Sequence, residues 1–279
     1  MKKVGIAFHP LNARVPELIS EISSVLYSHG LEQWQCSAWD VAELGKQLPG
    51  TDLILTLGGD GTILRVAQIL GGNQIPITGI NLGQLGFLTE ISPHDNRRLL
   101  SILAGEGWYD ERAMLEAELT QIVNGNTQTQ RFHALNDIVM ARGAIARIIE
   151  VTARIDGAVV NKYKADGALV SSATGSTGYA LAAGGPILNP KSTDMLLIPI
   201  LPHVSLQHPL VLDNTSEITL TLSTTSPATL SIDGHISLEL FDGCNVTVRG
   251  SAKRTRFLRI DPPEHFYASL SSKLSRATK

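Results

Sequence analysis

Cysteine, charge and long apolar runs are all scarce in this sequence of 279 residues. Its two cysteines, Cys36 and Cys244, stand far apart without metal-type spacing, which excludes a disulfide framework and fits a reducing cytosol. No run approaches the ~18 apolar residues of a membrane span. The apolar stretch after Lys2 and Lys3 is too short for a secretory signal. We therefore expect a cytoplasmic globular protein with no membrane partner.

Low charge also excludes some partners. Charged residues make up 18% of the chain and the net charge is −3, which argues against a nucleic-acid partner or a general binder of anionic membranes. Hydrophobic residues make up 43%, too many for a disordered chain. The small charged fraction, below the usual ~25%, suggests extra buried surface, for example between subunits.

The first hundred residues alternate between two patterns. Short apolar runs predict buried strands, and apolar residues at helical spacing predict helices between them. Proline near the start and glycine past the end mark the first helix. We expect strands over residues 4–8, 52–57 and 75–80, and helices over 16–29, 63–70 and 95–103. This alternation is typical of a parallel sheet with helices on its faces.

Strand patterns dominate after about residue 110. Ile149, Val151 and Ala153 alternate with polar residues, and Asp156-Gly157 supplies a tight turn. The predicted fold class is therefore α/β, with an N-terminal α/β domain containing a parallel sheet and a C-terminal, mainly antiparallel β domain. We expect the first domain at 1–108, with 256–279 returning to it, and the second at 109–255.

The sharpest motif is Gly58-Gly59-Asp60-Gly61-Thr62. It follows a predicted buried strand and precedes a predicted helix, whose free N–H groups and positive dipole end suit phosphate. Asp60 could accept a proton from an attacking hydroxyl or help to hold Mg²⁺. An Asp-Gly pair between apolar runs is also a strong hairpin signal, so a structural turn is the alternative. Neither of the two common glycine-rich nucleotide motifs is present.

A second loop, from Ser171 to Tyr179, is rich in hydroxyls and small residues. Its N–H and hydroxyl groups could bind phosphate or ribose, and Tyr179 could pack on a base. The alternative is a surface connection that only caps a helix. Lys164 and Asp166 lie just upstream and could line a polar pocket, although a solvated turn explains them equally well.

Taken together, the motifs resemble the NAD kinase family. The resemblance is carried, in the family's order, by Gly58–Thr62, Asn81–Leu88, Asn136-Asp137, Lys164–Gly167, Ala173–Tyr179, Gly184–Leu188 and Pro202-His203. It implies ATP-dependent phosphorylation of the adenosine-ribose 2′-hydroxyl of NAD, which gives NADP. It also implies a homodimer or homotetramer, and a divalent metal ion, Mg²⁺, that comes with ATP.

The resemblance also implies roles for single residues. Asp60 falls on the family's proton acceptor, and His235 stands where many members have Gln. The remaining implied binding residues for NAD and ATP are Gly61, Arg65, Phe87, Asn136, Asp137, Arg147, Lys164, Asp166, Thr177, Gly178, Tyr179, Ala180, Leu181 and Ala182. No protein side chains have the spacing of metal ligands.

Two other functions remain open from sequence. Diacylglycerol-type lipid kinases carry a similar glycine–aspartate loop, but such an enzyme needs a membrane-facing surface, and no basic amphipathic stretch is evident. A non-catalytic nucleotide sensor could keep the same fold, but the intact Asp60 argues against it.

Overall fold

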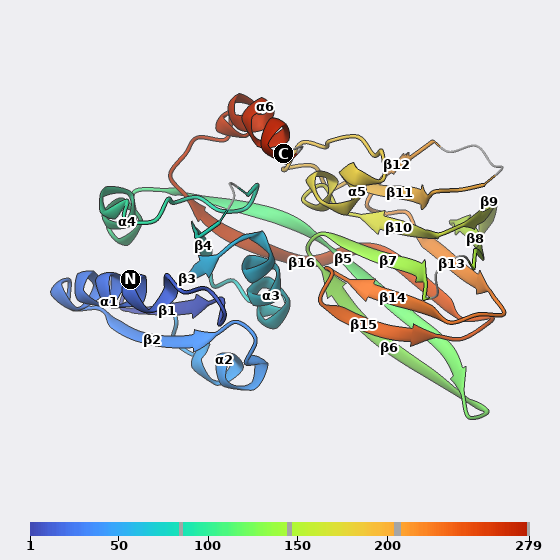
Figure 1. Cartoon of the computed structure of the whole chain (residues 1–279), viewed down its shortest axis with the longest axis horizontal. Coiled ribbons are helices and arrows are strands. Elements are labelled where there is room, and N and C mark those ends of the chain that lie inside the picture. The colour runs from blue at the N-terminus through green and yellow to red at the C-terminus, as the bar shows by residue number, and fades with distance from the viewer. Residues whose placement is uncertain (84–85, 144–146, 204–207, 278–279) are drawn as a thin grey trace. The chain divides into compact units, whose positions relative to one another are not determined.

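The computed structural model describes residues 1–83, 86–143, 147–203 and 208–277. The chain divides into two compact units: unit 1 comprises Met1–Glu111 and Thr255–Lys279, and unit 2 comprises Arg112–Arg254. Two long strands, β5 (Trp108–Val123) and β16 (Asn245–Arg259), each begin in one unit and end in the other (Figure 1). Unit 1 is therefore built from two segments that are distant in sequence.

Unit 1 contains a parallel sheet. Its strands lie in the order β2 (Glu32–Ser37), β1 (Lys3–Phe8), β3 (Leu53–Gly58) and β4 (Ile77–Asn81). Phe257 of β16 pairs in parallel with Ile77 at the edge of β4. The three strands expected from apolar runs are confirmed as β1, β3 and β4, whereas β2 was not predicted.

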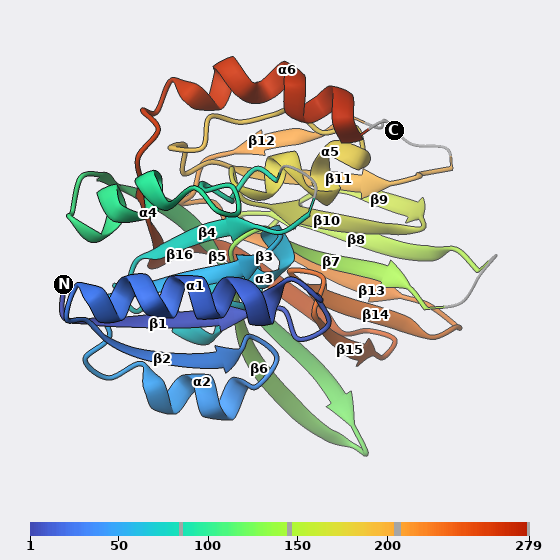
Figure 2. The same ribbon diagram turned by 60° about the vertical axis from the view of Figure 1, so that its left-hand side comes forward.

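Helices cover both faces of this sheet. They are α1 (Val15–Ser28), α2 (Val41–Gln47), α3 (Asp60–Leu70) and α4 (Asn96–Leu103), and α6 (His265–Ala277) follows β16. In α1, Leu18, Ile22 and Leu26 recur every fourth residue and pack with residues of α4 in one core. Figure 2 shows α1 lying along β1. Ile80 of β4 joins that core, while the neighbouring Gly79 faces Ile63 of α3. Consecutive strand residues point to opposite faces, so α3 lies on the other side.

Unit 2 is a pair of antiparallel sheets around one core. One sheet has the order β12 (Leu210–Leu212), β11 (Met195–Ile200), β10 (Gly167–Ser171), β7 (Asp137–Arg142), β14 (Ala228–Ile232) and β15 (Ile236–Leu240). Opposite it lie β16, β13 (Ile218–Ser223), β8 (Ile149–Ile155) and β9 (Ala158–Ala165), and the hairpin of β5 with β6 (Asn126–Ala134). Residues such as Val151, Leu220 and Val170 from both sheets meet in the core. The predicted fold class is confirmed.

Candidate active site

Asp60 is the first residue of α3. Gly59, in an extended conformation, is the N-cap residue between the fully buried β3 and this helix. Gly58 allows a tight connection, because a Cβ there would lie 2.1 Å from Thr62 Oγ1. The strand-to-loop-to-helix interpretation is confirmed and the hairpin alternative is wrong. The helical run after the loop, with Ile63, Ala67 and Leu70 buried, prevents a return strand.

The segment 86–88 wraps around the Asp60 carboxylate. Phe87 N donates to Oδ2 at 2.8 Å, and Leu88 N donates to Oδ1 at 3.1 Å. A Cβ at position 86 would lie 2.1 Å from Oδ1, so only glycine allows this approach. These two bonds fix the carboxylate and leave other oxygen lone pairs free to accept a proton or hydrogen bond. Gln84 and Leu85 of the same motif lie outside the described residues.

The other predicted residues of unit 1 lie around α3 and segment 86–88. Gly61 is exposed in the first turn of α3. Arg65, on the same helix, stacks on Trp39, with Cζ 4.4 Å from the ring centroid. The Phe87 ring lies 6.5 Å from that of Phe266 in α6. The structure thus brings Phe87 directly to Asp60, whereas Arg65 packs against an aromatic ring.

In unit 2, Asn136 and Asp137 are held by a residue that sequence analysis missed. The Asp233 carboxylate accepts from Leu135 N at 2.8 Å, Asn136 N at 2.7 Å and Asp137 N at 3.1 Å. Asp233 N in turn donates to Asp137 O at 3.0 Å. We call this arrangement the Asp233 clamp. It fixes the backbone that carries both predicted NAD-binding side chains.

Two buried polar atoms beside this clamp have no partner among the described residues. They are Oδ1 of Asn136 and Nε2 of His235, and His235 Nδ1 contacts the backbone oxygen of Asp233 at 3.1 Å. A buried polar atom without a hydrogen bond is costly. Both atoms therefore suit a ligand with complementary polar groups, as the sequence-based assignment of these residues requires.

The carboxyl of Asp137 is unusual in its proton affinity. Burial raises its pKa to about 7, and the neighbouring Asp233 adds to the effect. Burial also raises the pKa of Asp233, although its three N–H donors oppose this. Asp137 can therefore donate or accept a hydrogen bond near neutral pH.

The hydroxyl-rich loop packs against the Asn136 backbone. Ser172 N donates to Asn136 O at 2.9 Å, and Ser171 Oγ donates to the same oxygen at 3.2 Å. Gly175 must be glycine here, because a Cβ would lie 2.2 Å from Asn136 O. The loop continues as the 3₁₀ turn η1 (Gly175–Thr177) and the short helix α5 (Tyr179–Ala182).

Residues 177–182 differ in exposure. Tyr179 is 46% exposed, so its ring is available to a ligand, while Ala180 is fully buried. Thr177, Gly178 and Leu181 are half-buried, and Ala182 is exposed. The structure brings this segment and Asn136 together, since a Cβ at Gly178 would lie 3.4 Å from Asn136 Nδ2.

The predicted charged residues of unit 2 lie in three different settings. Asp166 pairs with Arg142, with Nε 2.8 Å from Oδ1 and Nη2 2.9 Å from Oδ2; sequence analysis missed Arg142. Lys164 stands opposite Glu150 in the β8–β9 pair and lines a surface pocket of about 500 Å³ with Asp242. Arg147 is exposed.

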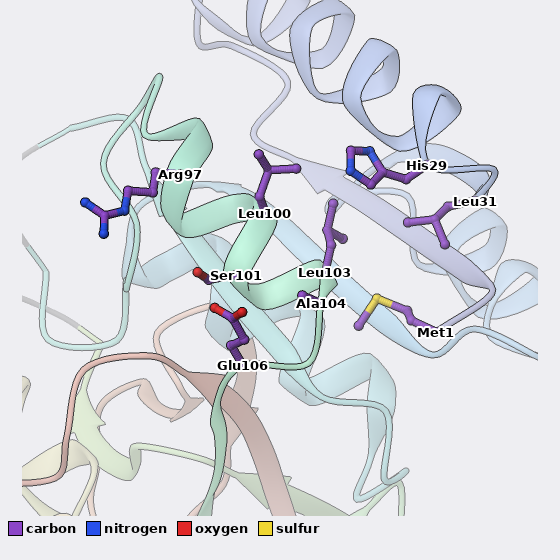
Figure 3. A pocket seen from close by; sticks show the side chains of 9 residues that line it. All are labelled: Met1, His29, Leu31, Arg97, Leu100, Ser101, Leu103, Ala104 and Glu106. Carbon is purple, nitrogen blue, oxygen red and sulfur yellow. The ribbon is translucent and has the colours of Figure 1, made fainter.

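A larger pocket of about 760 Å³ lies elsewhere in unit 1 (Figure 3). Leu31, Leu100 and Leu103 give it an apolar wall, and Arg97 and Glu106 lie at its polar side. None of the predicted site residues lines it. Size alone therefore does not identify the site.

The described residues contain no group of three or more His, Cys, Asp or Glu that could hold a metal ion. Mg²⁺ in nucleotide sites is usually held by substrate phosphates and only one or two carboxylates. Asp60, with lone pairs left on both oxygens, fits such a minimal contribution.

Comparison with known proteins supports the motif-based resemblance. Residues 8–106 match the ATP-NAD kinase N-terminal domain, and residues 135–260 match the ATP-NAD kinase C-terminal domain. An NAD kinase of Dehalococcoides mccartyi is 46% identical over 98% of this chain and 96% of its own. One of Chloroflexus aggregans is 35% identical over 99% of this chain and 100% of its own.

Solved structures give the same result. An NAD kinase from Archaeoglobus fulgidus, in complex with ATP, has a TM-score of 0.78 at 28% identity, covering 98% of each chain. A yeast NADH kinase complexed with NADH has a TM-score of 0.86 at 24% identity, covering 99% of this chain and 88% of its own. At 24% identity, the likeness to the yeast enzyme shows a similar fold and no more.

Proposed function

The chain belongs to the NAD kinase family and is an ATP-dependent NAD kinase, and from this premise we propose a role for each of its site residues. Asp60 acts as the proton acceptor for the 2′-hydroxyl of the adenosine ribose. The observation that carries this role is the carboxylate at the start of α3, oriented by two backbone amides.

Asp60 takes the proton late in the reaction. An alcohol is a far weaker acid than a carboxylic acid, so a carboxylate cannot ionise the hydroxyl in advance. Phosphoryl transfer passes through a loose transition state in which the oxygen becomes acidic only as its bond to phosphorus forms. Asp60 first orients the hydroxyl by accepting its hydrogen bond and then receives the proton. Such general-base catalysis is typically worth about 10²–10⁴ in rate.

The residues around the Asp233 clamp bind NAD. Asn136 Oδ1 and His235 Nε2 are buried and have no partner among the described residues. The Asn136 oxygen would accept a hydrogen bond from the nucleotide, and the His235 nitrogen would accept or donate one according to its tautomer. Asp137 lies beside them on the same clamped backbone. The exposed ring of Tyr179 and the small residues 177–182 provide a surface on which a base or ribose can pack.

The phosphates of both substrates require positive charge. Mg²⁺ bound to ATP supplies part of it and neutralises charge that develops on the phosphoryl oxygens. The family resemblance assigns the rest of this positive charge to the side chains of Arg65, Arg147 and Lys164. Arg147 is exposed, and Arg65 can leave its stacking contact with Trp39 at little cost.

The family resemblance implies the assembly, and the sequence composition led us to expect the location. We propose a cytoplasmic homodimer or homotetramer. No helix of the described residues is long and apolar enough to cross a bilayer, and Cys36 and Cys244 are both free. Light scattering coupled to gel filtration at several protein concentrations measures the assembly, and a monomer at all concentrations would contradict it.

The decisive experiment is an assay of the purified protein with NAD and Mg-ATP, together with Asp60→Asn. We expect the wild type to form NADP and the variant to lose at least ~10² in turnover while still binding NAD. Asp40→Asn is the matched control, because Asp40 caps α2 and Asn is an equally good capping residue. Turnover of Asp60→Asn near that of the wild type would show that Asp60 is not the proton acceptor.

A further inference from the structure

Lys273 on α6 is a half-buried cation that faces an aromatic ring. Its Nζ lies 5.3 Å from the centroid of the Phe87 ring. Within the part of the chain that the structure describes, no hydrogen bond or ion pair reaches this ammonium group. A desolvated charge with only a cation–π contact is incompletely compensated, since such contacts contribute about 0.5–2 kcal/mol.

The ring that Lys273 faces belongs to the residue that holds the catalytic carboxylate. Phe87 N donates to Asp60 Oδ2 at 2.8 Å, and Asp60 acts electrostatically on the Lys273 ammonium. Among the described residues, Asp60 itself has no ion-pair partner. A cation and an anion therefore lie around one aromatic residue, and neither is neutralised by a direct contact.

Other acids near Lys273 are already engaged. Glu90 accepts from the backbone N–H groups of Ile260 and Asp261, each at 2.8 Å, and pairs with Arg259 at 3.2 Å. Asp261 Oδ2 lies 2.8 Å from Arg98 Nη2. Burial and the positive charge of Arg259 together lower the pKa of Lys273. The ammonium group would thus gain from an additional anion.

We propose that Lys273 binds a phosphate group of ATP beside Asp60 and is a further binding residue of the phosphoryl-transfer site. Lysine suits this task because its compact charge sits on a flexible four-carbon stem that can leave the Phe87 ring for a ligand. A cation there would stabilise the negative charge that approaches the Asp60 carboxylate during transfer. This inference rests on the proposed function.

The competing explanation is structural, with Lys273 serving only to hold α6 on Phe87. The two explanations differ in their readouts. A contact with a phosphate of ATP depends on charge, so its loss weakens the binding of ATP but not the binding of NAD. A packing contact depends on side-chain bulk, and its loss lowers the unfolding temperature and disturbs both substrates.

The test compares Lys273→Met, Lys273→Arg and the control Lys46→Met, an exposed lysine of α2 in the same unit. We expect Lys273→Met to raise KM for ATP about tenfold or more, as for loss of one charged hydrogen bond, with KM for NAD within twofold. Lys273→Arg should restore most of the ATP affinity. Lys46→Met should match the wild type, and all unfolding temperatures should agree.

Calorimetric titration with Mg-ATP in the absence of NAD separates this inference from the proposed function. If the wild type binds ATP but forms no NADP, the proposed function fails while the titration still tests Lys273. Unchanged ATP affinity in Lys273→Met would overturn the inference. So would an equal loss of affinity for both substrates accompanied by a lower unfolding temperature.

Discussion

At the scale of single residues, two carboxylates of this enzyme lie in different environments. Asp60 is half-exposed and fixed by amides from a segment where only glycine fits at position 86. Asp137 is buried beside a second carboxylate, and its pKa rises to about 7. The role we propose for Asp60 needs an oriented carboxylate, while Asp137 keeps its proton to a much higher pH than an ordinary aspartate does.

This difference predicts how stability depends on pH. Between pH 4 and 7 the unfolded state ionises Asp137 while the folded state keeps its proton, so stability falls as pH rises through this range. Asp137→Asn removes the titration. We expect the stability of the variant relative to the wild type to increase by about 2 kcal/mol from pH 5 to pH 8 in urea unfolding. Parallel pH profiles for the two proteins would contradict the raised pKa.

At the scale of elements, a turn in one hairpin fixes a loop that belongs to another strand. Asp233 and Gly234, both with positive φ, form the turn between β14 and β15. The Asp233 side chain then binds the three backbone amides that lead into β7. The paired strands β7 and β14 therefore present Asn136 and Asp137 from a rigid support.

Asp233→Asn tests this clamp. Asparagine tolerates the same turn but has no charge, so buried N–H donors lose their strong acceptor. We expect a loss of at least about 2 kcal/mol in the free energy of unfolding and a higher KM for NAD.

The control for the clamp is Asp156→Asn. Asp156 has the same left-handed backbone before Gly157, but it is exposed, and among the described residues its carboxylate accepts only from Glu217 N, at 2.8 Å. Its substitution should cost less than about 1 kcal/mol and leave KM for NAD unchanged. Equal effects of the two substitutions would show that the clamp has no special role.

The sequence predicted the helices and strands that contain many buried apolar residues. Strands β1, β3 and β4 are short apolar runs, whereas β2 was missed because only Trp34 and Cys36 of its six residues are buried. Helix α2 was missed since it buries only Leu44. The glycine loop and the family were predictable from local motifs, and the family is confirmed. The site roles stay predictions.

Contacts between distant residues could not be predicted in this way. Asp233 binds an amide 98 residues earlier, and Lys273 faces Phe87 from the last helix. No local pattern distinguishes these residues from an ordinary turn aspartate or a surface lysine. Their importance depends on which segments the fold brings together.

At the scale of the whole molecule, the chain leaves unit 1 and returns to complete it. Residues 255–261 supply Arg259, whose guanidinium lies 3.3 Å from Asp110 Oδ2 and donates to Leu88 O at 2.7 Å. Glu90 binds Arg259 and the next two backbone amides. This buried cluster attaches the returning chain directly beside the segment that holds Asp60, so unit 1 is complete only after unit 2 has been synthesised.

Glu90→Gln tests this attachment. Glutamine keeps an oxygen for the amides of Ile260 and Asp261 but no longer neutralises Arg259, which is 7% exposed. Removing one partner of a buried ion pair leaves an undercompensated charge, so we expect a loss of about 3 kcal/mol in urea unfolding. Faster hydrogen exchange at those two amides should accompany it.

The matched control, Glu111→Gln, breaks the pair with Arg256, in which Glu111 is 49% exposed. Water screens that pair, and its loss should cost less than about 1 kcal/mol. Because Leu88 donates to Asp60 and its carbonyl accepts from Arg259, Glu90→Gln should also lower turnover, whereas Glu111→Gln should not. If Glu90→Gln lost stability but kept full turnover, attachment of the returning chain would matter for folding and not for placing the Asp60 carboxylate.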